Sequence, residues 1–373
     1  MVVPLAARWV AAAVGLALVL TAWASIIGTL IVPRPISSWL TRWVDRSVNW
    51  AFQLVTAPIH QHQRRDQVLA SQAPATLLAQ LIAWLAISFL GYMLLLWPFE
   101  KAGIASAFTS AGSAMFTLGF AVPFGPAPAA IVFAAAATGL VIVALQIAYL
   151  PVLYAAFNRR ETEVALLNAR AGVPSWGPEL LARTHYALGS GVSAIGALPD
   201  LYAQWERWAA DMTESHTTYL PLVRFRSPRP LSSWVTALLA VLDSAALILT
   251  LSPDTAPVVP ARLCLRSGFL CFRQIARAMG IDVPDEPDPN GQITLTYQEF
   301  LDAVARMREV DFPIERQPAE AWPEFVGWRL NYEQAAYAVA FAVDAVPALW
   351  SGPRRRDDRV IPPIRPPLGR QRK

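Results

Sequence analysis

The stretch SAMFTLGFAVPFGP, from Ser113 to Pro126, separates two long apolar runs and carries no charge. It contains a threonine, two glycines and two prolines, which together favour irregular backbone over a continuous helix. Irregular backbone at membrane depth is tolerated only where it is buried in protein or lines a water-filled cavity. The sequence therefore predicts that this stretch faces a pathway or a protein core, and not lipid.

The composition of the whole chain indicates an integral membrane protein. Of its 373 residues, 55% are hydrophobic and only 16% are charged, whereas an average soluble domain has about 25% charged residues. The net charge is +4, but the last twenty residues alone hold eight Arg or Lys and two Asp. The basic excess therefore belongs to the C-terminal tail, and we expect no nucleic-acid partner.

The first candidate transmembrane helix is Trp9 to Pro33, which contains no charge and exceeds the roughly 20 apolar residues that cross a bilayer. A cleaved signal peptide is the competing interpretation, because Arg8 precedes the run and AWA at Ala22–Ala24 resembles a cleavage site. The apolar run continues to Val32, which is long for a signal peptide and favours a retained helix.

Two further spans flank the opening stretch. Leu77 to Trp97 is a second apolar segment of membrane-spanning length. From Ala102 to Asn158 there are 57 residues without a charge, too many for one span and too few for two spans with an ordinary loop. A short helix, a re-entrant segment and one full span at Ala127 to Phe157 would fill this length.

Basic residues in the flanking loops predict the orientation. The linker 34–75 and the segment after the last span are rich in arginine, whereas the opposite side has only Arg8 and Lys101. The positive-inside rule then places the linker and the C-terminal half in the cytoplasm of a plasma-membrane protein, with the N-terminus outside. The arginines that decide this are Arg34, Arg42, Arg46, Arg64, Arg65, Arg159, Arg160 and Arg170.

The C-terminal half has the pattern of a helical domain. RRETEVALLNARAG continues out of the last span and stops at Gly172, and Leu201, Trp205 and Trp208 share one face of an amphipathic helix. Further helices are expected at 259–279, 296–309 and 318–348.

Trp234 to Leu251 is ambiguous, because it is apolar except for Asp243 near its centre. A transmembrane position would place this acid at mid-bilayer, at a cost of about 2.5–3.5 kcal/mol. We therefore favour a buried helix of the cytoplasmic domain. Cys264 and Cys271, about 10 Å apart along a helix axis, cannot form a disulfide there, which is typical of buried thiols in a reducing compartment.

Two spans that bracket a short helix and a Thr-x-Gly-aromatic turn form a known arrangement. The sequence resembles the pore module of potassium channels, and most closely bacterial one-pore ion-channel proteins with a helical cytoplasmic C-terminal domain. The likeness covers Leu77 to Pro174, including YLPVLYAAFNRRE after the last span. It extends weakly into the C-terminal domain through HTTYLPLVRFRSP and ALWSG.

The resemblance implies an ion filter. Ile104 to Met115 would be the pore helix, and Thr117, Leu118, Gly119 and Phe120 would occupy the filter positions, followed by Ala121. In this family four such segments, one from each subunit, aim backbone carbonyls at a dehydrated cation. The expected protein is therefore a homotetramer in a lipid bilayer that passes a monovalent cation, most simply potassium.

Three residues of the last span carry a possible gating or cavity role in the resemblance. Gly139 would be a hinge, although it could equally allow close helix packing. Gln146 lies on the same face and could line the cavity or bind a neighbouring helix. Pro151 could kink the helix or mark an interfacial break.

Ala121 departs from the family pattern, which has glycine at this position. A non-glycine residue held in the left-handed conformation costs about 1–2 kcal/mol. Either the outer end of the filter has a different shape, or the pore does not hold a potassium-type filter. A non-conducting protein that keeps the scaffold for sensing or partner binding is the alternative function.

The remaining motifs predict neither an enzyme nor a cofactor. No hydrolase triad, phosphate loop or zinc pattern is present in the sequence. HQH at His60–His62 is interpreted as a solvated loop and not a metal site. The stretch from Glu286 resembles half of a calcium loop, but Tyr297 stands where the bidentate Glu is required.

The predicted fold class is an all-α integral membrane protein with three transmembrane helices, a re-entrant pore helix and filter loop, and a helical cytoplasmic domain. The predicted order along the chain is a transmembrane helix (1–33), a cytoplasmic linker (34–75), a pore module (76–158), a cytoplasmic domain (159–352) and a disordered basic tail (353–373).

Overall fold

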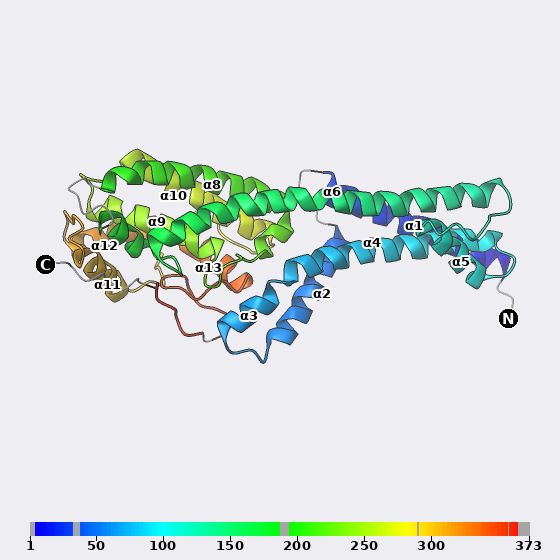
Figure 1. Cartoon of the computed structure of the whole chain (residues 1–373), viewed down its shortest axis with the longest axis horizontal. Coiled ribbons are helices and arrows are strands. Elements are labelled where there is room, and N and C mark those ends of the chain that lie inside the picture. Colours follow the sequence, from blue (N-terminus) through cyan, green and yellow to red (C-terminus); the bar gives the residue numbers. More distant parts are fainter. Residues whose placement is uncertain (1–3, 33–37, 187–193, 289–290, 357, 365–373) are drawn as a thin grey trace. The chain divides into compact units, whose positions relative to one another are not determined.

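The computed structural model describes residues 4–32, 38–186, 194–288, 291–356 and 358–364 (Figure 1). In this part of the chain the secondary structure is helical, with one isolated β-bridge between Ala348 and Ile361 and no strand. Arg34, Asn290 of the calcium-like stretch and residues 365–373 of the tail lie outside the described residues.

The chain forms two compact units. The first comprises Met1–Ala57 and Ser71–Ala155, and the second comprises Pro58–Ala70 and Ala156–Lys373. The predicted linker 34–75 is therefore shared between the units instead of forming a separate segment. The helices of the first unit are α1 (Leu5–Leu30), α2 (Trp39–Thr56), α4 (Gln72–Leu96), the 3-10 helix η1 (Trp97–Phe99), α5 (Ile104–Met115) and the first part of α6 (Pro126–Ala171).

Helices α1 and α4 approach each other closely at two glycines. A Cβ on Gly15 would lie 2.5 Å from the carbonyl oxygen of Gly91, and a Cβ on Gly91 would lie 2.7 Å from Cγ2 of Val19. Small residues at such crossings let membrane helices pack backbone to backbone. The predicted N-terminal helix is thus an integral part of the first unit.

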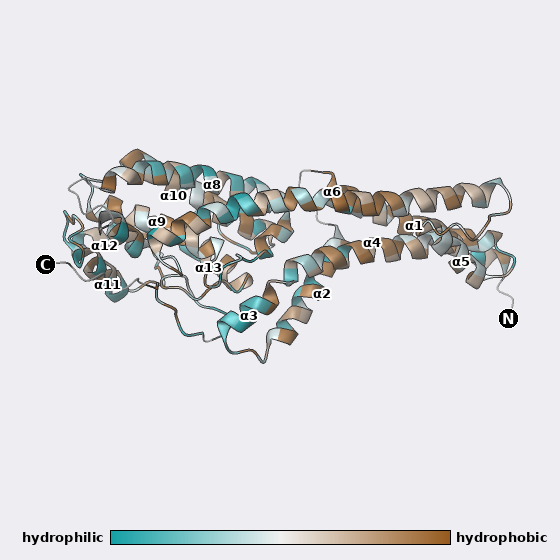
Figure 2. Cartoon of the chain, in the orientation of Figure 1, coloured by the Kyte–Doolittle hydropathy of each residue, from teal (hydrophilic) through white to brown (hydrophobic). Residues whose placement is uncertain are grey.

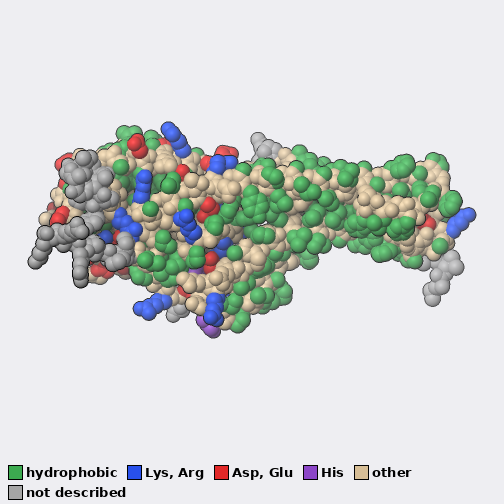
Figure 3. All heavy atoms as spheres, in the orientation of Figure 1, with side chains coloured by type: hydrophobic (Ala, Val, Ile, Leu, Met, Phe, Trp, Pro, Cys, Tyr) green, Lys and Arg blue, Asp and Glu red, His purple; other side chains and the backbone are tan. Residues whose placement is uncertain are grey.

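Four helical stretches among the described residues are long and apolar enough to cross a membrane: Leu5–Leu30, His62–Phe99, Pro126–Ala171 and Trp234–Leu251. Figures 2 and 3 show hydrophobic residues gathered over α1, α4 and the first part of α6. This surface is suited to lipid, and it supports the prediction of a membrane-embedded protein.

The second unit is built around α9 (Trp234–Leu251), all 18 residues of which are buried. The other elements of this unit are α3 (His62–Leu69), the end of α6, α7 (Gly177–Tyr186), η2 (Ala194–Ala197), α8 (Leu198–Thr218), η3 (Leu220–Arg224), α10 (Val258–Ala278), α11 (Tyr297–Arg308), α12 (Pro318–Leu330) and α13 (Glu333–Ala342). Leu201, Trp205 and Trp208 of α8 are buried, which confirms the predicted amphipathic face.

Asp243 of α9, which the sequence leaves without an obvious partner, lies at the centre of a buried polar network. Its Oδ1 accepts hydrogen bonds from the Arg329 guanidinium and from the Tyr332 hydroxyl, the latter at 2.7 Å. Arg329 also donates to Glu333 at 2.5 Å and to the Trp350 carbonyl at 2.8 Å. The helix expected at 318–348 divides into α12 and α13 at this network.

Helix α3 is held in the second unit by a buried arginine. Arg65 Nε donates to Asp344 at 2.6 Å, and its Nη2 pairs with Asp358. The neighbouring Asp66 accepts a 2.6 Å hydrogen bond from Arg226. Arg65 is therefore a structural anchor and not a solvated loop residue.

Ordered packing continues past the predicted domain boundary at 352. Arg354 is buried and donates to the carbonyls of Ala345 and Val346, each at 2.6 Å. The first part of the basic tail is thus packed, because the Arg354 guanidinium is bound to backbone carbonyls of the second unit.

Candidate functional site

A twelve-residue helix, α5, precedes the glycine-bearing stretch, with the same bounds that the sequence predicts for the pore helix. Glu100, four residues before the helix, is bound to its first two turns: the carboxylate accepts hydrogen bonds from Ser106 at 2.6 Å and from Ser110 at 2.8 Å. The two serines are four residues apart and share one face of the helix.

Ser113, in the last turn of α5, organises the stretch that follows. Its carbonyl oxygen accepts from the amides of Leu118 at 2.8 Å and Gly119 at 3.3 Å. Its hydroxyl accepts from the Ala121 amide at 3.0 Å. Three amides of the segment therefore point back at one residue of the helix, which holds the backbone in a compact turn.

The signs of the backbone angles alternate at the start of this segment. Thr117 has φ +55° and Gly119 has φ +73°, whereas Leu118, Phe120 and Ala121 are not in the positive region. The glycine expected at position 121 is therefore not needed for this conformation. A strained angle falls instead on Thr117.

The carbonyl oxygens of residues 117–121 accept no hydrogen bond within the described part of the chain. Unpaired carbonyls cannot face hydrocarbon, since each would cost several kcal/mol. The segment thus turns amides inward and leaves acceptors available. Such acceptors can replace water around a cation.

The apolar side chains in and around the segment are exposed to solvent in a single chain. The apolar residues with more than half of their surface exposed are Phe116, Leu118, Phe120, Val122 and Phe124. A patch of this kind marks a surface that lipid or another protein chain covers.

Gly139 of α6 lies against the end of α5. A Cβ at this position would collide with the Met115 carbonyl oxygen. The close approach gives Gly139 a packing role, which is one of the two roles the sequence allows. Gln146, on the same face, is buried, and its Oε1 has no hydrogen-bond partner in the described residues.

Pro151 lies inside α6, which continues through it to Ala171. The large exposed residues of α6 lie on a different face from Gly139, and this face was not singled out from the sequence. Its large residues recur every seven positions at Phe133, Leu140, Ile147 and Tyr154. A seven-residue spacing in the sequence is the signal that could have revealed this stripe.

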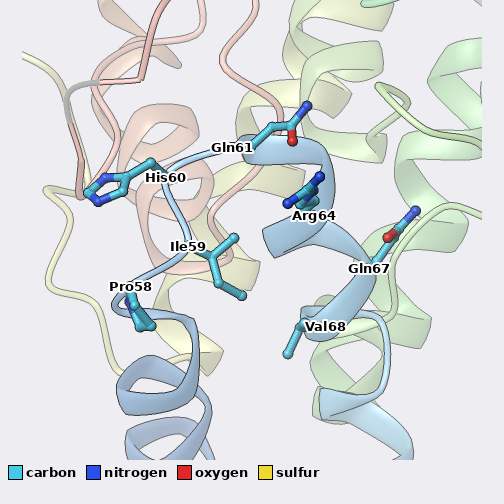
Figure 4. Close-up of a pocket in the computed structure, with 7 residues that line it drawn as sticks. All are labelled: Pro58, Ile59, His60, Gln61, Arg64, Gln67 and Val68. Carbon is cyan, nitrogen blue, oxygen red and sulfur yellow. The ribbon is translucent and has the colours of Figure 1, made fainter.

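A surface pocket lies in the second unit, beside α3, and is shown in Figure 4. It is lined by Pro58, Ile59, His60, Gln61, Arg64, Gln67 and Val68. The His60–His62 motif is only partly solvated, because His62 is buried with its Nδ1 3.3 Å from Arg65 Nη2. The described residues contain no group of three or more His, Cys, Asp or Glu side chains able to hold a metal.

These features give one candidate site, in which Ser113 orders the segment from Thr117 to Ala121 and leaves its backbone carbonyls available to a cation. Comparison with known proteins adds nothing to it: no protein-family model, curated protein or solved structure matches the chain.

Proposed function

We propose that the protein is a tetrameric cation channel whose filter is the backbone of Thr117 to Ala121. One observation carries the proposal: the amides of Leu118, Gly119 and Ala121 are bound to Ser113, while the carbonyl oxygens of residues 117–121 have no partner in the described residues. A cation that loses its hydration shell needs a set of such oxygens, and one chain supplies only one strand of them.

The exposed surfaces support assembly of several chains. Leu118 and Phe120 are each 62% exposed in a single chain. The exposed stripe of α6 repeats every seven residues, which is the period of helices that supercoil around one another. Four copies would cover both surfaces and bring four filter segments around one axis.

The two-unit organisation supports the proposed topology. Helix α3 and the C-terminal helices belong to one unit, which favours a topology with both on the same side of the membrane. Helices α4 and α6, which lie between them in the chain, then cross the membrane in opposite directions. With α1 this gives three spans, α5 as the pore helix, and α9 inside the cytoplasmic unit. The positive-inside rule makes that side cytoplasmic.

Potassium is the proposed permeant ion. Positive φ at Thr117 and Gly119 alternates with φ outside that region at Leu118 and Phe120, and the unpaired carbonyls of this segment are the kind of oxygens that a dehydrating filter requires. Because Ala121 stands where the family pattern has glycine, we assign the proposed potassium sites to the inner part of the segment.

Cation flux from liposomes containing the full chain tests the proposal. Gly119 and Gly125 both have positive φ, +73° and +96°, and at either position an added Cβ would have no heavy atom within 4 Å. Alanine therefore imposes a similar strain of about 1–2 kcal/mol per chain at each site. Because only Gly119 belongs to the filter, Gly119→Ala should abolish potassium flux or its selectivity, and Gly125→Ala should preserve both.

The outcomes separate the two functions. Equal flux from the two alanine variants would place the conduction path elsewhere. Absence of flux from the folded wild-type protein and from Ala121→Gly would refute conduction and leave the non-conducting scaffold. Flux that appears only in Ala121→Gly would identify a degenerate filter.

A further inference from the structure

Helix α2 has two apolar faces, and only one of them is packed. Leu40 and Val44 are buried in a cluster with Ile26 and Trp84. A neighbouring side carries Trp39, Trp43, Trp50 and Leu54, which are 58%, 62%, 64% and 53% exposed. Their spacings of four, seven and four residues place all of them on one face of the helix.

The beginning of α2 is fixed next to the end of α1. Ser38 caps α2 by accepting from the Thr41 amide at 3.2 Å, and its hydroxyl lies 2.7 Å from that of Ser25. Ser25 in turn accepts from the Trp84 indole at 3.0 Å. Because Ser25 lies five residues before the end of α1, α2 begins within about 7.5 Å of that helix end along the axis.

In the proposed topology, where α1 crosses the bilayer, this position is at the boundary of the membrane. Ile27 of α1 and Leu78 of α4, in the same unit as α2, are also exposed apolar residues, at 41% and 58%. Tryptophan is enriched at this depth, because the indole ring is apolar and its N–H reaches the headgroups.

The charges of α2 select the kind of lipid. Arg42 and Arg46 are exposed and follow Trp39 and Trp43 by three residues, so they flank the tryptophan face. The only acid of the helix, Asp45, lies well away from the middle of this face and is half-buried. A basic edge beside an aromatic face complements anionic headgroups.

We propose that the face formed by Trp39, Trp43, Trp50 and Leu54 lies in the headgroup boundary of the cytoplasmic leaflet, with Arg42 and Arg46 on anionic lipid headgroups. The face then anchors the segment between α1 and α3 to the bilayer. The proposal holds whether or not the chain conducts ions.

Depth-dependent quenching of a fluorescent thiol label tests this placement. The full chain carries Trp43→Cys and is reconstituted in phosphatidylcholine–phosphatidylglycerol vesicles. The native Cys264 and Cys271 are buried and stay unlabelled in the folded protein. Ile82→Cys, at an exposed position of α4, provides an acyl-chain reference, and Arg64→Cys, at an exposed position of α3, provides an aqueous reference.

A label at position 43 should be quenched more by a nitroxide near the lipid headgroup than by one near the chain end, and little by aqueous iodide. The Ile82→Cys label should show the reverse lipid preference, and the Arg64→Cys label should respond to iodide alone. Quenching of the position 43 label by iodide alone would overturn the proposal. Protection from all three quenchers would also overturn it and would identify a second copy of the chain on this face.

The anionic part of the proposal has its own test. Quenching by headgroup nitroxide should increase with the phosphatidylglycerol fraction, and Arg42→Gln with Arg46→Gln should remove that increase. Arg64→Gln, which changes an exposed arginine outside α2, should preserve it. Quenching that does not depend on phosphatidylglycerol in the parent protein would overturn recognition of anionic lipid.

Discussion

Replacing Arg329 by methionine should strongly destabilise the second unit, because it leaves a buried carboxylate without its cation. The side chains of Arg329 and Asp243 are 0% and 2% exposed. Burial raises the pKa of Asp243, and Arg329 is the main group that opposes this rise. Without the arginine, the carboxyl is expected to become protonated in the folded state.

The size of the effect follows from that protonation. Keeping a carboxyl of ordinary pKa near 3.9 protonated at pH 7 costs about 4 kcal/mol, at 1.36 kcal/mol for each of about three pH units. This agrees with the loss of about 3–5 kcal/mol that is typical when one partner of a buried ion pair is removed. At pH 5 the same reasoning gives about 1.5 kcal/mol. The folded variant keeps a proton on Asp243 that the unfolded chain releases. The loss of unfolding free energy therefore grows as pH rises above about 4.

The two cysteines supply the assay. Both are buried in the core of the second unit and are the only thiols of the chain. Their labelling under native conditions, normalised to the unfolded chain at each pH, measures the free energy of opening this unit. A loss of about 4 kcal/mol corresponds to labelling that is roughly a thousandfold faster.

Second substitutions separate charge from packing. In the Arg329→Met background, Asp243→Asn should restore most of the lost stability, because it removes the unpaired carboxylate. Glu333→Gln should restore less, since Glu333 also accepts from the Thr294 amide. A loss that is the same at pH 5 and pH 7, or one that Asp243→Asn does not relieve, would refute the electrostatic reasoning.

Three other outcomes are expected. Arg65→Ala should remove about 3–5 kcal/mol from the docking of α3, seen as faster hydrogen exchange of residues 58–70, whereas the exposed Arg64→Ala should leave exchange unchanged. Gly139→Ala should lower the melting temperature through an overpacking loss of about 1–3 kcal/mol, whereas Gly112→Ala, whose Cβ finds ordinary contact at 3.5 Å, should not lower it. Burial, reinforced by a neighbouring guanidinium, holds the pKa of His216 well below its ordinary value. The folded protein therefore loses stability as pH falls below about 6.5, because the unfolded chain binds a proton at this histidine that the folded chain does not. His216→Gln should reduce this loss of unfolding free energy between pH 7 and pH 5.

Much of the helical architecture is readable from local sequence patterns. Long uncharged runs identify α1, α4 and α6, because crossing a bilayer requires a minimum apolar length. The gap in charge from Ala102 to Asn158 predicts a short helix, whose bounds the resemblance to channel pore modules supplies, and helical periodicity identifies the buried face of α8. These are properties of consecutive residues, so no knowledge of distant partners is needed.

The candidate filter is only partly readable in the same way. Thr117 and Gly119 stand out in the sequence, but the role of Ser113 depends on the turn that brings the Ala121 amide to its hydroxyl. The glycine at 119 is expected from its conformational freedom, whereas the positive φ of Thr117 follows from that turn.

The sequence by itself determined a helical protein with helices long and apolar enough to cross a membrane, because hydropathy and periodicity act along consecutive residues. Only the tertiary structure decided that Asp243 meets Arg329, that Arg65 docks α3 beside Asp344, and which face of α2 stays uncovered. Those pairs are separated by up to 279 positions. Their choice depends on which buried charges the packed helices bring within hydrogen-bond distance, and no local pattern encodes that.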